Sequence, residues 1–236
     1  MGAAGLELDA VGELSPAQLT GSGRRELRHL FSSHQLDIAA LVCPLRHGLE
    51  VAENQDARID RLRQAMSMAF DVGCRLVVIQ PGPLVFDEKD TRYAVLADAL
   101  AALGRHGDHV GARLAIETGF DSPEAVETLL ARFDAGSLAV ALNPGNLLAQ
   151  GHDPYEAIRT LRSRLVYVRA SDARRAGAGR LGRRMPVGHG DLDWMQLTAN
   201  FEEIEYRGWL TVEADAGPNA LVELSAGVAF LQRLNA

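Results

Sequence analysis

Cysteine is scarce in this chain of 236 residues, and no CxxC spacing occurs. Cys43 and Cys74 each stand beside an apolar run, so we expect buried structural thiols rather than a disulfide framework. This cysteine usage favours a cytoplasmic location. No apolar run approaches the length of a membrane span, and the first ten residues lack the basic and apolar segments of a secretory signal. We therefore expect no membrane partner.

Positive charge is also limited. Lysine and arginine number 24 against 31 aspartates and glutamates, which gives a formal net charge of −7 at pH 7. A chain with this balance has no global basic surface, so we expect no nucleic-acid partner. Hydrophobic residues make up 47% and charged residues 23%, as in an ordinary globular protein that is long enough to bury a sizeable core.

The chain does contain a repeated pattern, in which a short apolar run is followed by a polar loop and an amphipathic helical segment. The runs are continuous rather than alternating, which is typical of parallel strands covered by helices. Helix signals lie between them, such as Asp153 before Pro154, Ser122 before Pro123, and Gly73 at a helix end. The apolar runs occupy residues 6–11, 36–42, 75–80, 113–117, 138–143, 165–169 and 209–213.

This alternation predicts an α/β fold, namely a TIM-type (β/α) barrel in a single domain over residues 1–236. Seven strands are one fewer than the usual eight. An open barrel would leave strand edges unpaired, which proteins normally avoid. Three arrangements stay open: a closed seven-stranded barrel, N-terminal residues that fill the gap, or a homo-oligomer in which a partner subunit covers the open edge.

Polar residues follow most of the predicted strands. In barrels of this type the active site lies at the carboxyl ends of the strands, so we expect these residues to converge on one mouth. A single residue of this kind is often only a loop cap, but charged groups at the inner ends of apolar strands are costly unless they are paired or used. The residues are Gln80, Glu117, Asn143 with Asn146 just beyond, Arg169 with Asp172 three residues later, and Glu213.

The loop after Arg169 contains "GAGRLG" at residues 177–182, which fits the pattern GxGxxG. A dinucleotide-binding site needs a strand directly before this pattern and a helix directly after it, and we expect neither. The loop favours either a solvated surface or an anion-attracting lid over a phosphorylated or carboxylated substrate. His189, in "GHGDLDW", is a further candidate for contact with substrate. The loop arginines are Arg174, Arg175, Arg180, Arg183 and Arg184.

Six segments carry a resemblance to a known family. They are "GLELDA", "AMSMAFDVGCRLVVIQPG", "LAIETG", "ALNPGNLLAQGHDPYEAI", "LVYVRASDA" and "MPVGHGDLDWMQLTANFEEIEYRGWLTVEAD". Through them the chain resembles the xylose isomerase-like barrels of sugar phosphate isomerases and epimerases, with the family's first strand missing. The last segment is the most specific, because it combines Pro-x-Gly-x-Gly, Asp-Trp, and Tyr-x-Gly before a strand that ends in glutamate.

The resemblance implies a divalent metal held by Glu, Asp, His and Glu at four strand ends. The glutamates match Glu117 and Glu213, but the aspartate falls on Asn143 and the histidine on Arg169. Arginine cannot ligate a metal. We therefore expect no metal cofactor. A Mn²⁺, Mg²⁺ or Zn²⁺ ion, should one bind, would be held by Glu117, Asn143 and Glu213.

Charge counting suggests what replaces the metal. The family's three carboxylates and one dication sum to −3 + 2 = −1, and Glu117, Glu213 and Arg169 sum to −2 + 1 = −1. We expect Arg169 to take the electrostatic place of the metal and to fork between the two glutamates.

Sugar isomerisation and epimerisation remove a proton next to a carbonyl and return it, which needs a base, an acid and positive charge near the oxyanion. We expect Glu117 and Glu213 to be base and acid on a small carbohydrate. The alternative is a non-catalytic relative that binds a carbohydrate or a protein. An apurinic endonuclease would need a histidine-rich metal cluster, which this acidic chain does not predict. Asp172 is expected to pair with an arginine of the following loop. The expected substrate-binding residues are Arg169, Asn143, Asn146, Gln80, His189 and Asp172.

Overall fold

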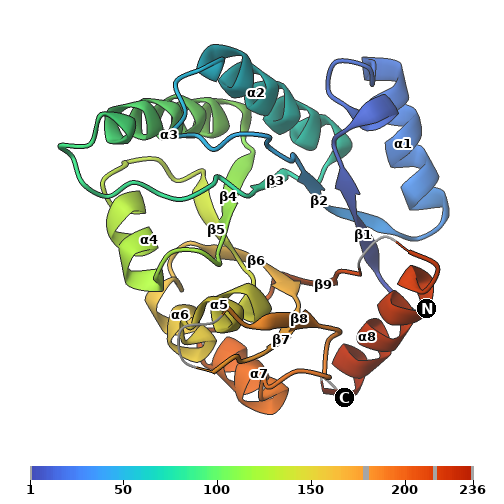
Figure 1. Cartoon of the computed structure of the whole chain (residues 1–236). Coiled ribbons are helices and arrows are strands. Elements are labelled where there is room, and N and C mark those ends of the chain that lie inside the picture. The colour runs from blue at the N-terminus through green and yellow to red at the C-terminus, as the bar shows by residue number, and fades with distance from the viewer. Residues whose placement is uncertain (1, 178–180, 215–216, 235–236) are drawn as a thin grey trace. The chain divides into compact units, whose positions relative to one another are not determined.

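The computed structural model describes residues 2–177, 181–214 and 217–234. The chain forms two compact units. The N-terminal unit consists of residues 4–117 and 128–140, and the C-terminal unit consists of residues 1–3, 118–127 and 141–236. Each unit is described by itself below, with the elements labelled as in Figure 1.

Seven strands pair in the order β1-β2-β3-β4-β5-β6-β9, which follows the order of the chain. The pairs β1–β2, β2–β3, β3–β4 and β6–β9 are parallel. Each predicted apolar run overlaps one of these strands, so the prediction of seven parallel strands is confirmed. The strands are β1 (Gly5–Asp9), β2 (Asp37–Val42), β3 (Leu76–Ile79), β4 (Arg113–Glu117), β5 (Leu138–Leu142), β6 (Leu165–Ala170) and β9 (Trp209–Val212).

The helices of the N-terminal unit cover its strands with apolar faces. In α2, Ile59, Leu62 and Met66 recur at helical spacing and are buried. The helix ends at Gly73, whose φ of 92° is the left-handed cap that the sequence predicts. In Figure 1, α2 and α3 lie side by side, and they pack together. The helical elements are the 3-10 turn η1 (Gly12–Leu14), α1 (Gly21–Ser33), α2 (Gln55–Val72) and α3 (Thr91–Val110).

The C-terminal unit repeats strand, loop and helix with the predicted caps. The side chain of Asp153 accepts the backbone N–H of Tyr155 and of Glu156, with Pro154 in the first turn. Ser122 accepts the N–H of Ala125 in the same way. The helices are α5 (Pro144–Gln150), α6 (Pro154–Thr160), α7 (Trp194–Glu203) and α8 (Ala220–Leu234), while α4 (Pro123–Leu130) has residues in both units.

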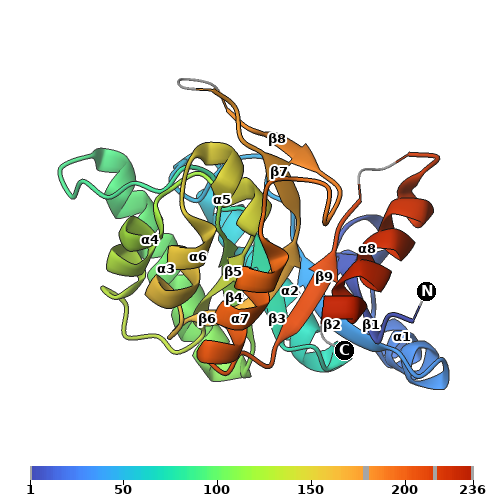
Figure 2. The same cartoon turned by 90° about the horizontal axis from the view of Figure 1, so that it is seen from below.

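A two-stranded antiparallel hairpin follows β6, where the sequence predicts only a loop. Its strands are β7 (Asp172–Arg174) and β8 (Arg183–Met185), and Figure 2 shows it extending past the end of α5. The hairpin escaped prediction because its strands are short and charged, so no apolar run marks them. Residues 178–180, including Arg180 and the centre of the GxGxxG pattern, lie outside the described residues.

Two further expectations can be compared with the fold. Both cysteines are free thiols; Cys43 is buried and Cys74 is half-buried, and this burial raises the pKa of each thiol. Among the helices of the described residues, none is both long and apolar enough to cross a membrane.

Candidate functional site

An ion pair lies at the ends of two neighbouring strands in the C-terminal unit. Arg169 lies near the end of β6, and Glu213 directly follows β9, which is the neighbouring strand. The guanidinium of Arg169 and the carboxylate of Glu213 form an ion pair, with side chains that are only 10% and 17% exposed. The ion pair that we expected between Arg169 and Glu213 is therefore present.

A second arginine reaches the same carboxylate from the hairpin. Nη2 of Arg184 in β8 lies 3.2 Å from Oε2 of Glu213, while Arg169 contacts Oε1. Each carboxylate oxygen thus has a guanidinium beside it, and these three groups sum to −1 + 2 = +1. Nearby positive charge favours the ionised form of a carboxylate.

Asn143 directly follows β5 and holds the start of α5. Its Oδ1 accepts the backbone N–H of Asn146 at 2.9 Å and also the hydroxyl of Ser171. Its own N–H donates to Oγ1 of Thr118 at 2.9 Å. Asn143 is 2% exposed. The amide therefore caps a helix and ties three chain segments together, and its oxygen already has two donors.

Asp172 anchors the segment between β6 and α7. It is completely buried, and its carboxylate accepts the N–H groups of Ala173, Gly188 and Leu192 at 2.8, 3.0 and 3.3 Å. The indole N–H of Trp194 donates to Oδ2 at 3.0 Å. We expected Asp172 to pair with a loop arginine, and this was wrong for the described residues: its four donors are backbone and indole N–H groups that fold the loop around it.

His189 lies on the outer part of that same loop. The residue is exposed, and its backbone N–H donates to the carbonyl of Pro186 at 3.0 Å. The structure thus places the imidazole of His189 at the surface of the C-terminal unit.

In the N-terminal unit, Gln80 and Glu117 meet at adjacent strand ends. Nε2 of Gln80, just after β3, donates to Oε2 of Glu117 at the end of β4, at 3.2 Å. Glu117 is 7% exposed. A buried carboxylate that accepts an amide N–H is oriented by it, so this pair has the form of a positioned acid or base.

Glu50 is a buried carboxylate in the same unit that sequence reasoning missed. It is 9% exposed, and its Oε2 has no hydrogen-bond partner among the described residues. It packs against Gly48 and Gly82, where an added Cβ would meet its carboxylate. The signal in the sequence was the Gly-x-Glu after the second apolar run, which lies in a loop several residues beyond the strand end.

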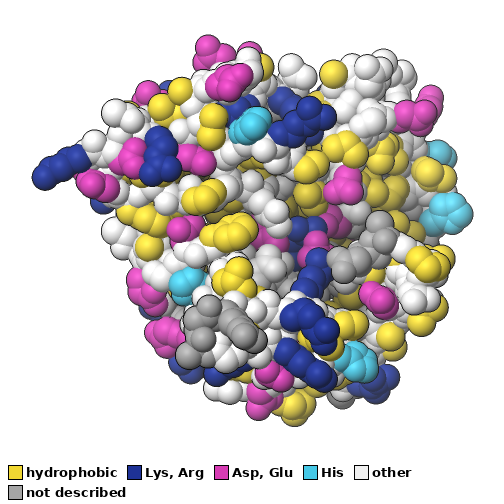
Figure 3. Space-filling model, in the orientation of Figure 1, with side chains coloured by type: hydrophobic (Ala, Val, Ile, Leu, Met, Phe, Trp, Pro, Cys, Tyr) yellow, Lys and Arg dark blue, Asp and Glu magenta, His cyan; other side chains and the backbone are white. Residues whose placement is uncertain are grey.

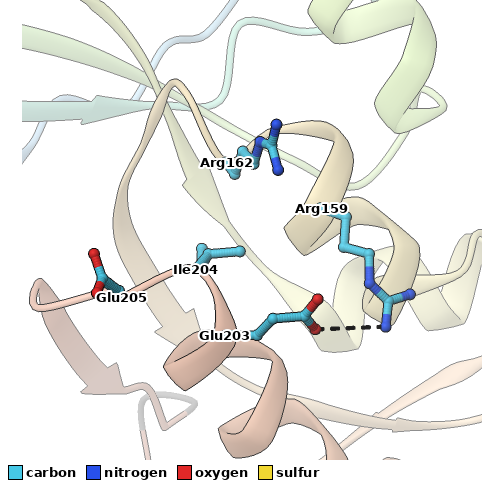
Figure 4. Close-up of a pocket in the computed structure, with 5 residues that line it drawn as sticks. All are labelled: Arg159, Arg162, Glu203, Ile204 and Glu205. Carbon is cyan, nitrogen blue, oxygen red and sulfur yellow. Dashed lines mark ion pairs between the residues drawn. The ribbon is translucent and has the colours of Figure 1, made fainter.

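Two clefts lie elsewhere in the units. One, of about 350 Å³ in the C-terminal unit, is lined by Arg159, Arg162, Glu203, Ile204 and Glu205. Figure 4 shows Arg159 directed at Glu203, with which it forms an ion pair at 3.8 Å. The other, of about 650 Å³ in the N-terminal unit, is lined by residues after β1, namely Gly12, Glu13, Ser15 and Gln18.

Comparison with known proteins assigns the chain to a family. The model of the xylose isomerase-like TIM barrel family matches residues 1–234. The chain belongs to this family. The predicted TIM-type α/β barrel fold and the resemblance noted in the sequence are both confirmed.

Solved structures of xylose isomerase-like proteins share the fold. A xylose isomerase domain protein from Planctomyces limnophilus has a TM-score of 0.89 at 19% identity, covering 98% of this chain and 88% of that one. The 3-keto-D-glucoside 4-epimerase YcjR from E. coli has a TM-score of 0.77 at 14% identity, with coverages of 98% and 90%. A Mycobacterium smegmatis family member in complex with magnesium has a TM-score of 0.76 at 16% identity, with coverages of 98% and 84%.

Among characterised sequences, an inosose dehydratase from Lacticaseibacillus casei is 24% identical over 155 residues. The match covers 57% of this chain and 52% of that relative, so this chain spans about half the length of the curated relatives that it matches. A second inosose dehydratase, from Clostridium tetani, is 25% identical over 155 residues, with the same coverages.

Members of the xylose isomerase-like family bind divalent metals, and such an ion needs several strong electron-pair donors. At Asn143, to which the resemblance assigns the family's aspartate, the side-chain oxygen is neutral and accepts two hydrogen bonds. At Arg169, to which the resemblance assigns the family's histidine, the side chain is permanently cationic and lies against Glu213. Within the described residues, no group of three or more His, Cys, Asp or Glu side chains is arranged to hold a metal. These residues do not fit a divalent ion.

Proposed function

We propose that this chain is a sugar-modifying enzyme that transfers a proton next to a carbonyl group, as an isomerase or epimerase of a small sugar or sugar phosphate. Family membership supports the substrate class, since its relatives include an epimerase of a keto-glucoside and inosose dehydratases. Removal of a proton next to a carbonyl is a step that epimerisation, isomerisation and dehydration of hydroxy-ketones can share. The proposed reaction class is therefore broader than the reaction named for any one relative.

Glu213 is the proposed base. An ionised carboxylate takes the proton from the carbon next to the carbonyl, and the electron pair of that C–H bond moves to the carbonyl oxygen to form an enediolate. The guanidinium groups beside both oxygens of Glu213 favour the ionised form that this step requires. Return of the proton to the former carbonyl carbon, with transfer of the neighbouring hydroxyl proton to the enediolate oxygen, gives the isomer. Return of a proton to the original carbon on its opposite face gives the epimer.

Glu117 is the proposed second proton-transfer group. It is buried at a strand end and is oriented by Gln80. Asn143, Asn146, His189 and the strand-end Arg169 remain proposed contacts to substrate. Asp172 acts in this proposal through the loop that it holds, because its carboxylate is occupied by four protein donors.

Arg169 is the proposed source of positive charge for the enediolate oxygen. One unit charge at about 4 Å contributes roughly 4 kcal/mol at an effective dielectric near 20. A monocation in place of a dication thus forfeits about that much, or roughly a thousandfold in rate. We therefore expect a slow enzyme that needs no added metal. The observation that carries the proposal is the largely buried Arg169–Glu213 pair at adjacent strand ends.

The test follows deuterium from D2O into ketoses, ketose phosphates and inososes by NMR, with EDTA present and then with added Mn²⁺. We expect exchange at the carbon next to the carbonyl in EDTA, and a rate at least about a hundredfold lower for Glu213→Gln. Glu203→Gln, an exposed glutamate of the same unit, is the matched control and should exchange normally. If no compound exchanges under either condition, the protein is a non-catalytic carbohydrate- or protein-binding relative.

A further inference from the structure

The hairpin after β6 concentrates positive charge in an acidic protein. Residues 173–190 contain five arginines and neither aspartate nor glutamate, whereas the whole chain has a net charge of −7. Four of these arginines, Arg174, Arg175, Arg183 and Arg184, lie within the described residues and are exposed. In Figure 3, dark blue side chains gather over the hairpin. The fifth, Arg180, plays no part in the proposal below.

Strand register places two of these arginines directly opposite each other. In the β7–β8 ladder, Arg174 pairs with Arg183, and Ala173 pairs with Arg184. Successive side chains of a strand point to opposite faces, so Arg174 and Arg183 share one face while Arg184 lies on the other. Like charges directly opposite on a sheet are destabilising. The arrangement thus has a cost that an anion bound between the two guanidinium groups would offset.

The protein itself supplies little to balance these charges. Arg184 is engaged by Glu213 at 3.2 Å. Among the described residues, no carboxylate forms an ion pair with Arg174, Arg175 or Arg183. The guanidinium of Arg183 lies 3.6 Å from the sulfur of Met185, and Asp191 accepts only the backbone N–H of Arg175, at 2.9 Å.

Two other arginines of the same unit have carboxylates close to them. Arg159 lies within 4 Å of both Glu156 and Glu203, and Arg164 lies within 4 Å of Glu127. These two arginines have carboxylate neighbours in the same unit, whereas Arg174 and Arg183, which face each other across the ladder, have none among the described residues.

The stem of the hairpin is fixed against the unit. Asp172 anchors the first strand through four donors, and the backbone N–H of Gly182 donates to the carbonyl of Ala149 in α5 at 2.7 Å. A Cβ at Gly182 would lie 2.7 Å from the Cα of Ala149, so the hairpin packs closely on α5. Guanidinium groups on a fixed stem lose less freedom on binding than groups on a free loop.

We propose that Arg174 and Arg183 form an anion-binding site that holds the phosphate or carboxylate group of the substrate. Guanidinium groups bind both groups through paired, charge-assisted hydrogen bonds. Arg183 is followed along β8 by Arg184, which contacts Glu213 from the other face of the hairpin, so the site lies one residue along the strand from the contact with the candidate base. This inference rests on the proposed function for the identity of the ligand as substrate, and it narrows that substrate to an anionic sugar.

Calorimetric titration with inorganic phosphate at constant ionic strength tests the site without turnover. The test variant is Arg174→Gln with Arg183→Gln, and the matched control is Arg159→Gln with Arg162→Gln, which removes the same charge from the same unit. We expect saturable binding to the native protein, at least tenfold weaker binding to the hairpin variant, and a change below twofold in the control. Absence of saturable binding, or equal weakening in both variants, would overturn the proposal.

Three sugar ligands then identify the natural group: a ketose phosphate, a sugar acid and the neutral ketose. The hairpin variant should lose affinity for one of the two anionic sugars and keep its affinity for the neutral one. Loss of affinity for the ketose phosphate alone identifies a phosphate site, and loss of affinity for the sugar acid alone identifies a carboxylate site.

Catalysis separates the anion-site proposal from the proposed function. Deuterium exchange into the neutral ketose, unchanged in the hairpin variant and no slower than into either anionic sugar, would overturn the anion site and leave the proposed function standing. Saturable phosphate binding without deuterium exchange into any sugar would overturn the proposed function and leave the anion site standing.

Discussion

The guanidinium of Arg169 and the carboxylate of Glu213 form an ion pair that joins the ends of two neighbouring strands, β6 and β9. Arginine stays charged at every pH at which a protein folds. Arg184 contacts the same carboxylate, so replacement of Arg169 would weaken the charge balance at Glu213 without leaving that carboxylate wholly uncompensated.

A metal site can be tested by restoring the family's donors. In the double variant Arg169→His with Asn143→Asp, an imidazole and a carboxylate replace two groups that do not ligate metals well. We expect calorimetric binding of Mn²⁺ to be at least tenfold tighter in the double variant than in the native protein or in either single variant. The control is Arg162→His with Asn219→Asp, which makes the same replacements elsewhere in the C-terminal unit. Equal Mn²⁺ affinity in the native protein and the double variant would contradict the argument.

Asp172→Asn should weaken the loop between β6 and α7. In asparagine, an NH2 group replaces one of the two carboxylate oxygens. This group cannot accept the N–H groups that bond to that oxygen, so buried hydrogen bonds to a charged group are lost. We expect the free energy of unfolding to fall by about 2–4 kcal/mol in urea titrations followed by tryptophan fluorescence. Asp193→Asn is the control, since asparagine caps α7 as well as aspartate does. Similar losses in the two variants would show that Asp172 is not an anchor.

His106 makes the stability of the N-terminal unit depend on pH. Burial lowers the pKa of this imidazole, whose Nε2 lies 3.2 Å from Oγ of Ser67 and 3.0 Å from the carbonyl of Arg63. The unfolded chain therefore binds the proton more readily than the folded one. This contribution to stability is fully present above about pH 6.5 and is lost as the pH falls through the lowered value.

The corresponding measurement is the melting temperature between pH 7.5 and pH 5. His106→Asn should flatten the decline with falling pH, while His29→Asn, which changes an exposed residue of α1, should leave it unaltered. A decline of the same steepness in the His106→Asn variant would assign the pH dependence to other groups.

Gly48 should not tolerate a side chain. A Cβ there would lie 2.6 Å from the carbonyl oxygen of Pro81 and would also collide with the carboxylate of Glu50. Overpacking of this kind costs about 1–3 kcal/mol, so Gly48→Ala should unfold at a lower urea concentration. Gly21→Ala, at the start of α1 where no atom lies within 4 Å, provides the control and should unfold as the native protein does.

Much of the fold could be predicted from the sequence because its signals are local. Continuous apolar runs such as 165–169 mark strands, and Asp153–Pro154 and Gly73 mark helix ends within a few residues. The β7–β8 hairpin could not be predicted in this way. Its strands are held by register and by the buried carboxylate of Asp172, whose partners Gly188 and Trp194 lie well along the chain.

The candidate site was predictable in its composition but not in its contacts. The ends of the apolar runs identified Gln80, Glu117, Arg169 and Glu213 as strand-end residues, because parallel strands bring their ends to one edge. The contact of Arg169 with Glu213 was expected, whereas that of Gln80 with Glu117 was not. The contact of Arg184 with Glu213 could not be predicted, because it depends on which face of the hairpin Arg184 occupies. Glu50 was hidden for a similar reason: its burial between glycines depends on loop packing rather than on any periodic pattern.

The positive charge at the end of β6 is part of the polypeptide. A bound cation can be removed by chelators, exchanged for a competing ion or left unfilled when supply is short, but a guanidinium paired with Glu213 is present from the moment the chain folds. In the proposed reaction, such a site would trade some rate for independence from metal supply. Starvation for manganese or zinc, which disables enzymes that need those ions, should leave this protein unaffected.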